Sequence, residues 1–174
     1  MLERKNLWAP WRIGYIKTAA DKTDHECFIC HAIDHPNQDK QNLVLWRSGL
    51  SVVMLNRYPY NNGHMLIAPQ RHVSDLEDLD DDEMLDLMCC VRQVKRCLAQ
   101  AMNPHGYNVG INLGRCAGAG LPGHLHIHIL PRWNGDTNFI STCTDVEVIS
   151  QSLEELRDQL KETASEHGFF DVDD

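Results

Sequence analysis

The sequence predicts a domain that contains both strands and helices, and three observations support this prediction. Five short runs of apolar or alternating residues are separated by turn-forming residues, as strands are. Two longer stretches repeat apolar residues every three or four positions, which is typical of amphipathic helices. A third pattern alternates histidine with aliphatic residues over 123–132 and favours a strand with two chemically different faces.

The composition favours one acidic globular domain. The chain has 174 residues, of which 43% are hydrophobic and 24% charged, which is ordinary for a folded domain of this length. Its formal net charge of −9 argues against a general binder of DNA, RNA or anionic membranes. We expect a single domain over 1–174, with an aromatic N-terminal arm over about 1–20 and an acidic tail over about 168–174.

The cysteine count indicates a reducing compartment. There are seven cysteines, an odd number. Residues 1–17 contain no apolar run of the length that a signal peptide or a membrane span needs. We therefore expect a cytoplasmic protein without a membrane partner, whose cysteines are thiols or metal ligands rather than disulfides.

The first half of the chain is predicted to form three strands. The β-branched runs 42–47 and 50–56 flank a short turn and predict a hairpin. The segment 57–63 is rich in turn residues and predicts a loop, and 64–69 predicts the third strand. His64 stands at this junction between loop and strand, where functional groups are often mounted.

Two segments are predicted to be helical. The range 80–102 begins with Asp80 and Glu83, a spacing that resembles a capping box, and Gly168 is expected to end a closing helix over 148–167. The expected apolar stripe of the first helix consists of Met84, Leu87, Met88, Val91, Val94, Leu98 and Met102.

A glycine-rich loop over 114–123 follows the predicted fourth strand, 107–113. Glycines allow backbone N–H groups to approach an anion, and Arg115 offers a guanidinium that suits phosphate. The same composition also fits a plain hairpin loop. At the N-terminus, the tryptophans of 7–13 either pack as an arm on the body or help to cover a bound base.

Cys27 and Cys30 form a Cys-x-x-Cys motif. Two thiolates at this spacing can bind one Zn²⁺ from a turn, which we favour over a redox dithiol or two unpaired thiols. A redox pair would follow a buried strand, whereas the preceding 21–26 is polar. A zinc site needs two further ligands.

The histidine run carries the strongest chemical signal. In a strand, His124, His126 and His128 share one face and span about 13 Å. Three histidines spread over that distance cannot all reach one ion at about 2.1 Å, which disfavours a catalytic zinc on the row. The aliphatic residues between them face a core, and Pro131, which lacks an N–H, is expected to end the strand.

The three histidines of the row are therefore expected to have different roles. His124 is free to turn toward the two cysteines as a third zinc ligand, while His126 and His128 remain for chemistry. The fourth ligand is expected from His72, or from His31 or His35 near the cysteines. Such a closed Cys₂His₂ site would be structural.

This histidine run resembles the signature of the histidine-triad family of nucleotide hydrolases and transferases. The resemblance extends over most of the chain, from about 7 to about 160. Two segments are similar to the hairpin region that precedes the signature in this family: Asn56-Arg57-x-Pro59-x3-Gly63-His64 and Pro69-x-Arg71-His72-Val73. Other segments resemble the bacterial branch that contains diadenosine tetraphosphate phosphorylases, namely Trp8-x-Pro10-x-Arg12, Cys27-x-x-Cys30, Asn112-Leu-Gly114, Ala117-Gly118 and Pro131-Arg132-Trp133-x-Gly135-Asp136-x-Asn138-Phe139.

The resemblance implies a fold and a set of roles. The fold is α+β, a five-stranded antiparallel sheet with a long central helix and a C-terminal helix, usually paired as a homodimer. His126 corresponds to the nucleophile that attacks an α-phosphorus, and His128 and His64 correspond to histidines at the phosphate. Residues implied to bind substrate are Asn56 at the ribose, with Asn112, Gly118 and Arg115 near the phosphates or leaving group. Residues implied to bind structural Zn²⁺ are Cys27, Cys30, His72 and His124.

The resemblance also implies an activity. The chain is expected to cleave dinucleoside polyphosphates through a nucleotidyl-histidine, which phosphate or water then resolves, on substrate that can arrive with Mg²⁺. The longer glycine loop, without the glutamine of eukaryotic hydrolases, leaves the leaving-group contacts open. Two alternatives are a hydrolase of AMP conjugates and a zinc-stabilised nucleotide-binding interaction protein.

Overall fold

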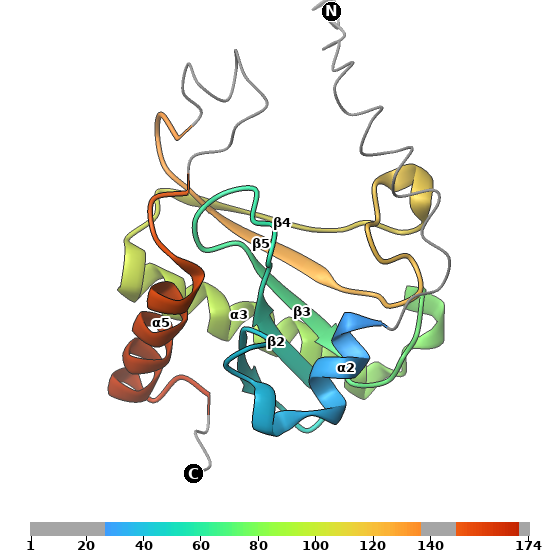
Figure 1. Cartoon of the computed structure of the whole chain (residues 1–174). Coiled ribbons are helices and arrows are strands. Elements are labelled where there is room, and N and C mark those ends of the chain that lie inside the picture. Colours follow the sequence, from blue (N-terminus) through green and yellow to red (C-terminus); the bar gives the residue numbers. More distant parts are fainter. Residues whose placement is uncertain (1–26, 137–148, 171–174) are drawn as a thin grey trace, which may run out of the picture.

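A computed structural model describes residues 27–136 and 149–170. Its centre is a five-stranded antiparallel sheet with the strand order β1-β2-β3-β5-β4 (Figure 1). The strands are β1 Val44–Arg47, β2 Ser51–Leu55, β3 Met65–Pro69, β4 Gly106–Ile111 and β5 Ile127–Arg132. The helices are α2 Phe28–Asp34, α3 Asp81–Met102 and α5 Leu153–His167, with 3-10 turns η1 Pro36–Gln38, η2 Leu76–Asp78 and η3 Arg115–Ala117. The predicted α+β fold is confirmed.

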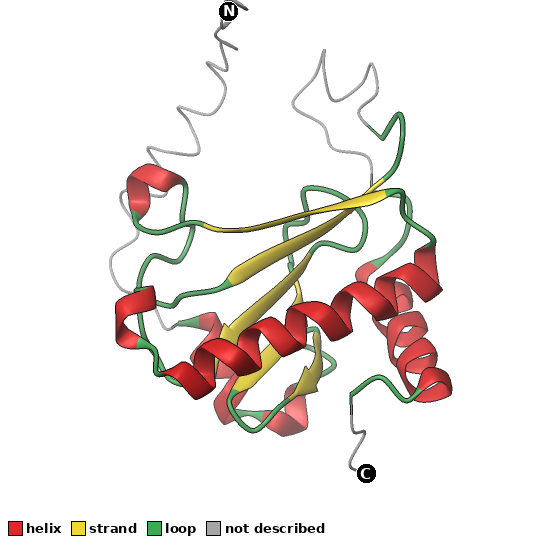
Figure 2. Ribbon diagram, turned by 180° about the vertical axis from the view of Figure 1, so that it is seen from behind, coloured by secondary structure: helices red, strands yellow, loops and turns green. Residues whose placement is uncertain are grey.

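Helices cover the two faces of the sheet unequally. The long helix α3 crosses one face, with α5 beside it (Figure 2). The larger core lies there, and its residues include Ile67, Leu98 and Leu160, none of which is exposed. The opposite face has a smaller core, in which α2 covers β1, β2 and β3 but does not extend over β5. That part of the second face is where the histidines lie.

The register of β3 and β5 places His128 on this second face, and the His126 ring lies next to the His128 ring, with centroids 4.9 Å apart. Leu66 of β3 pairs with His128 of β5. Directly paired residues of an antiparallel ladder point to the same side, and Leu66 belongs to the smaller core. Leu125, Ile127 and Ile129 instead join the larger core under α3. The predicted alternation, with histidines on one face and aliphatic residues on the other, is confirmed.

Helix α3 begins as the sequence predicts. The Asp80 side chain accepts from the Glu83 N–H at 2.8 Å, and Glu83 accepts from the Asp80 N–H at 3.0 Å, which completes the capping box. The predicted apolar stripe was partly wrong, because Met84 and Met88 are 44% and 58% exposed. Successive residues lie 100° apart around a helix, so Met88 falls on the flank of the buried face, and Cys90 is buried there instead.

Strand β5 differs from its prediction at both ends. The hydrogen-bonded strand begins at Ile127, so His124 and His126 precede it, and it continues through Pro131 to Arg132. Pro131 was expected to end the strand. It does not, because β3 pairs only as far as Ile129 and the Pro131 backbone faces the 57–63 loop, where its carbonyl accepts from Asn61. No strand partner needs the missing N–H.

The closing helix is shorter than predicted. It begins at Leu153 rather than at 148, because the Ser152 hydroxyl caps it by accepting from the Glu155 N–H at 3.2 Å. Gly168 ends it in the left-handed conformation, as expected. The aromatic arm, most of the acidic tail, Asn138 and Phe139 lie outside the described residues. Within 27–136 and 149–170, no helix has the length and apolar character needed to cross a membrane.

Candidate active site and metal centre

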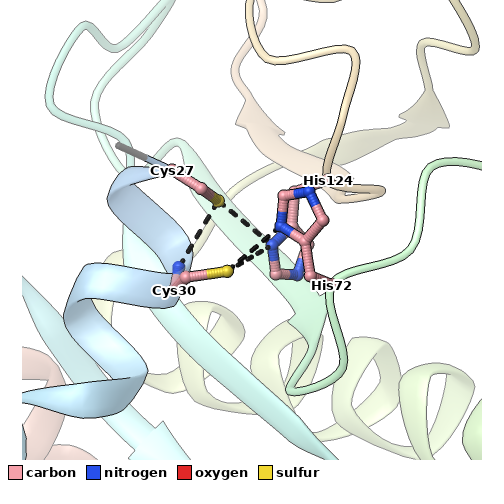
Figure 3. A group of neighbouring side chains, drawn as sticks. All are labelled: Cys27, Cys30, His72 and His124. Carbon is pink, nitrogen blue, oxygen red and sulfur yellow. Dashed lines mark hydrogen bonds between the residues drawn. The ribbon is translucent and has the colours of Figure 1, made fainter. Parts of the chain in front are cut away.

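Two cysteines and two histidines from three separate segments meet beside the sheet (Figure 3). The Cys27 Sγ lies 3.2 Å from His124 Nδ1, and the Cys30 Sγ lies 3.1 Å from His72 Nδ1. All four ligand atoms lie within 4.8 Å of one another. In tetrahedral zinc sites with bonds of about 2.0–2.3 Å, ligand atoms are separated by about 3.3–3.8 Å. The two sulfur and two nitrogen donors therefore fit a Zn²⁺ ion.

Local hydrogen bonds orient the ligands toward this centre. Cys27 is the N-cap of α2, and its Sγ accepts from the Cys30 N–H at 3.4 Å, so both sulfurs lie at the helix start. His124 is fully buried, and its Nε2 lies 2.9 Å from the Pro69 carbonyl. Because that carbonyl accepts a hydrogen bond from the Nε2–H, His124 Nδ1 carries its lone pair toward the sulfurs.

The structure also decides between the candidate fourth ligands. His72, which follows β3, lies in the cluster. His31 and His35 instead stack on each other with ring centroids 4.3 Å apart. The pKa of the Cys30 thiol is raised to about 11 by burial and by the neighbouring Cys27. A metal ion must displace that proton, because thiolate is the ligand form.

His126 lies directly after the metal cluster on the chain. It is buried, with 6% of its surface exposed, and its Nδ1 lies 2.8 Å from the carbonyl oxygen of His124. That carbonyl can only accept, so Nδ1 carries the proton and Nε2 carries the lone pair. Burial lowers the pKa of His126 against the opposing effect of this hydrogen bond. The geometry presents a neutral imidazole whose Nε2 is available as a nucleophile.

His64 and His128 form a pair of neighbouring imidazoles beside His126. The His64 Nε2 and the His128 Nδ1 are 2.9 Å apart, and the His126 and His128 ring centroids are 4.9 Å apart. The backbone N–H of Tyr60 donates to His64 Nδ1 at 3.1 Å, and the Tyr60 ring lies 4.8 Å from the His64 ring. The His128 Nε2 is buried and has no hydrogen-bond partner among the described residues.

Burial keeps this pair neutral. It lowers the pKa of His64 from 6.5 to about 3, with a further decrease from His128 and His126. It lowers the pKa of His128 to about 4, with a contribution from His126. Both rings are therefore neutral near pH 7, and each carries one donor and one acceptor nitrogen.

Strand β4 leaves space beside the histidines. Gly110 pairs with His128, so both point to the same face, and a Cβ added at Gly110 would meet nothing within 4 Å. Asn112 follows Ile111 of the last β4–β5 pair by one residue, and His126 precedes its partner Ile127 by one residue. Gly110 therefore leaves the space beside His128 unfilled.

The remaining predicted substrate residues lie in loops that follow β4 and β2. Arg115 and Gly118 lie at the η3 turn after β4, where Gly118 has a φ of +93°. Asn56 follows β2, and its Nδ2 lies 3.3 Å from His64 Nδ1, while its Oδ1 accepts from the Tyr58 N–H at 2.9 Å. The assignment of these residues, Asn112 and the catalytic histidines to substrate stays a prediction.

A sheet with a row of three histidines on one face and a long helix on the other is typical of one class of protein, which a family comparison identifies. The sequence model of the HIT domain family matches residues 37–135, which is over half of the chain. The chain therefore belongs to the HIT (histidine triad) family. The family predicted from the histidine run is confirmed.

Comparison with individual proteins shows which members of the family the chain is similar to. Over 157 residues the chain is 41% identical to AP-4-A phosphorylase of Mycobacterium tuberculosis, covering 88% of this chain and 80% of that protein. It is 39% identical over 93 residues to the asymmetrical bis(5'-nucleosyl)-tetraphosphatase of Schizosaccharomyces pombe, covering 53% of this chain and 50% of that protein. The fold is similar to that of a zinc-bound histidine triad family protein from Mycobacterium smegmatis, with a TM-score of 0.66, 21% identity and coverage of 82% and 96%.

Sequence reasoning missed the parts of the site that come from the backbone. The Tyr60 N–H and the carbonyls of His124 and Pro69 orient the imidazoles, and no side-chain pattern signals a backbone contact. It also missed that Asn61 and Asp136 contact each other, with Asn61 Nδ2 donating at 3.0 Å. Both residues stand in segments that resemble the family, but they are 75 positions apart.

Proposed function

We propose that this chain cleaves dinucleoside polyphosphates, such as diadenosine tetraphosphate, at an α-phosphate through a nucleotidyl-histidine at His126. The observation that carries the proposal is the 2.8 Å contact between His126 Nδ1 and the His124 carbonyl, which leaves Nε2 as a buried, unprotonated nitrogen. Similarity to AP-4-A phosphorylase at 41% identity supports the choice of substrate.

The proposed reaction has two displacements. In the first, His126 Nε2 forms a bond to the α-phosphorus and the bond to the bridging oxygen breaks, which releases the rest of the polyphosphate. With diadenosine tetraphosphate the products are AMP-His126 and ATP. In the second, phosphate or water attacks the phosphorus and the P–N bond breaks, which gives ADP or AMP and restores the imidazole. Two displacements allow the second acceptor to choose the product.

His128 is proposed to donate to the phosphate during both displacements. Its Nε2 lacks a partner among the described residues, and the side-chain space at Gly110 beside it is open. A donor held in a buried site stabilises charge that develops on phosphate oxygens. Asn112, Arg115 and Gly118 are proposed to contact the polyphosphate, and Asn56 the ribose. Mg²⁺, if present, would arrive with the substrate.

Zn²⁺ is proposed as a structural ion held by the two cysteines with His72 and His124. A closed set of four protein ligands leaves no position for a reactive water, so the ion supplies folding stability. His124 connects this centre to the nucleophile, because its ring faces the sulfurs while its carbonyl orients His126. The ligand thiolates would persist in a reducing compartment such as the cytoplasm.

A homodimer is the assembly we propose. Strand β4 is an edge strand of the sheet, and Val109 on it is 49% exposed. An edge with exposed apolar residues is suited to pairing with a second copy. Light scattering coupled to size-exclusion chromatography should give twice the 19.9 kDa mass of one chain, and a monomer at micromolar concentration would contradict the dimer.

Product analysis tests the function. The purified protein is incubated with diadenosine tetraphosphate with and without inorganic phosphate, and the nucleotides are separated by chromatography. Formation of ADP with ATP only when phosphate is present supports phosphorolysis, whereas AMP with ATP in both cases indicates hydrolysis. Absence of any cleavage, with rapid turnover of an AMP phosphoramidate, would instead support a hydrolase of AMP conjugates.

A further inference from the structure

A network at the end of β5 holds the loop that precedes His64. Asn61 Nδ2 donates to the Asp136 carboxylate at 3.0 Å and lies 3.3 Å from the Pro131 carbonyl. Arg132 donates to both oxygens of Asp136 at 2.6 and 2.7 Å, and the Asp136 side chain is only 11% exposed. Low exposure and bidentate geometry make this a rigid anchor rather than a loose surface pair.

The anchored loop delivers one backbone donor to the histidine pair. Tyr60 directly precedes Asn61, and its N–H donates to His64 Nδ1 at 3.1 Å. The Asn61 carbonyl accepts from the His64 N–H at 3.2 Å, so contacts on both sides of Asn61 fix it relative to His64. Moving Asn61 away from Asp136 would therefore move the Tyr60 N–H away from the imidazole.

That donor, together with Asn56 Nδ2 at 3.3 Å from the same His64 nitrogen, determines where the protons of two imidazoles lie. His64 Nδ1 accepts from Tyr60, so a neutral His64 carries its proton on Nε2. His64 Nε2–H then donates to His128 Nδ1 at 2.9 Å, which places the His128 proton on Nε2. His128 Nε2, which has no hydrogen-bond partner among the described residues, is therefore a donor. The reverse arrangement would set two donors, the Tyr60 N–H and a His64 Nδ1–H, against each other.

We propose that Asp136 and Asn61 are positioning residues for the reaction: they hold the Tyr60 N–H against His64 and so keep the His128 proton on the nitrogen that meets the phosphate. The proposal deepens the proposed function, on which its catalytic part rests. It assigns a task to the Arg132–Asp136 pair, which lies outside the histidine row.

The test compares two matched carboxylates. Asp136→Asn weakens the anchor with almost no change in shape. Asp39→Asn is the control, because Asp39 also forms a short pair with an arginine, Arg47, at 2.6 Å, but on β1 rather than beside the histidines. Asn61→Ala is a second variant that removes the loop donor and leaves the Arg132–Asp136 pair intact. ¹⁵N NMR of the imidazoles, assigned with His64→Gln and His128→Gln variants, reports which ring nitrogen carries each proton.

We expect the wild type and Asp39→Asn to show a single Nε2–H form for both His64 and His128. Asp136→Asn and Asn61→Ala should show mixed or exchanging forms for both rings. On diadenosine tetraphosphate their kcat should fall about tenfold with KM changed less than about twofold, because positioning of the donor is lost rather than binding. Asp39→Asn should keep the wild-type kcat.

Imidazole spectra that match the wild type in both Asp136→Asn and Asn61→Ala would overturn the proposal, even if the melting temperature falls. An Nδ1–H form of His128 in the wild type would overturn it as well. The spectra need no turnover, so they separate this proposal from the proposed function. If the wild type never forms a nucleotidyl-enzyme, the function fails while the spectra still decide the role of Asp136.

Discussion

Gly63 precedes the buried His64 in a conformation that other residues avoid. Its φ is +80°, and a Cβ at this position would lie 2.8 Å from the Pro131 Cγ and 3.0 Å from the Met102 Sδ. Both the backbone and the contact with β5 therefore require glycine. The close approach of loop and strand is part of what holds His64 beside His128.

Replacing Gly63 by alanine should destabilise the fold by about 1–3 kcal/mol, because the backbone is strained and Pro131 must move. Urea unfolding followed by circular dichroism measures the change. Gly49→Ala is the matched control in another loop, since nothing lies within 4 Å of its added Cβ, and we expect a change within about 0.5 kcal/mol. Equal stability of the two variants would show that the loop does not need Gly63.

His64 and His128 make the stability depend on pH in a defined direction. Burial lowers the pKa of His64 from 6.5 to about 3 and that of His128 from 6.5 to about 4. Between each lowered value and pH 6.5, the unfolded chain therefore binds a proton that the folded chain does not. Stability from these groups is present above pH 6.5 and is lost as the pH falls toward 4.

We expect the free energy of unfolding to fall between pH 7 and pH 5, and to fall less steeply in His64→Gln, which cannot take up the proton. Urea titrations at several pH values, performed on both proteins, measure the two slopes. Comparing slopes cancels protonation at other sites, including the metal ligands. Parallel slopes would mean that His64 titrates normally in the folded state.

The elements around the metal centre are short and depend on the ligands that join them. Helix α2 has seven residues and buries Ile29 and Ala32 against the sheet. So short a helix is marginal without tertiary contacts, and the four ligands tie its first turn to the segments after β3 and before β5. The carbonyl that orients His126 belongs to one of these ligands, His124.

Cys27→Ser should reduce bound zinc from about one ion per chain to a small fraction, because a closed site needs all four ligands. Metal content by inductively coupled plasma mass spectrometry measures this. Cys89→Ser, on α3 and outside the cluster, is the control and should keep its zinc. His126→Ala should also keep zinc, since it is not among the four ligands. Zinc lost in His126→Ala but kept in Cys27→Ser would instead support a metal on the histidine row.

Some elements could be predicted from sequence because their signals are local. The capping box at Asp80, the stop at Gly168 and the alternation of the histidine strand depend on neighbours within a few residues. The start of β5 and the tolerance of Pro131 could not be predicted, because they depend on where β3 stops pairing. Ser152 offered a local capping signal, with Glu155 three residues later, and that signal was missed.

At the scale of the whole molecule, some features of the candidate site could also be predicted from the sequence, whereas others depend on tertiary folding. The two cysteines and His124 could be predicted to gather because their side chains suit one ion. The residues alone left His72, His31 and His35 as candidates for the fourth ligand, the family resemblance implied His72, and the structure brings His72 to the other three. The separation of the row into a metal end and a chemical end followed from the spacing of the histidines together with the Cys-x-x-Cys motif upstream. The contacts between Asp136 and Asn61, and between Tyr60 and His64, arise from tertiary folding and left no pattern in the sequence.

The central claim is that one face of the sheet holds two sites, with a structural metal at His124 and a nucleophile at His126. Rapid quenching of the protein mixed with radiolabelled diadenosine tetraphosphate, followed by peptide mapping, tests this claim most directly. We predict an acid-labile, alkali-stable AMP adduct on His126, absent in His126→Gln, with zinc content unchanged in that variant. Label on His128 or His64, or turnover that persists in His126→Gln, would contradict the account.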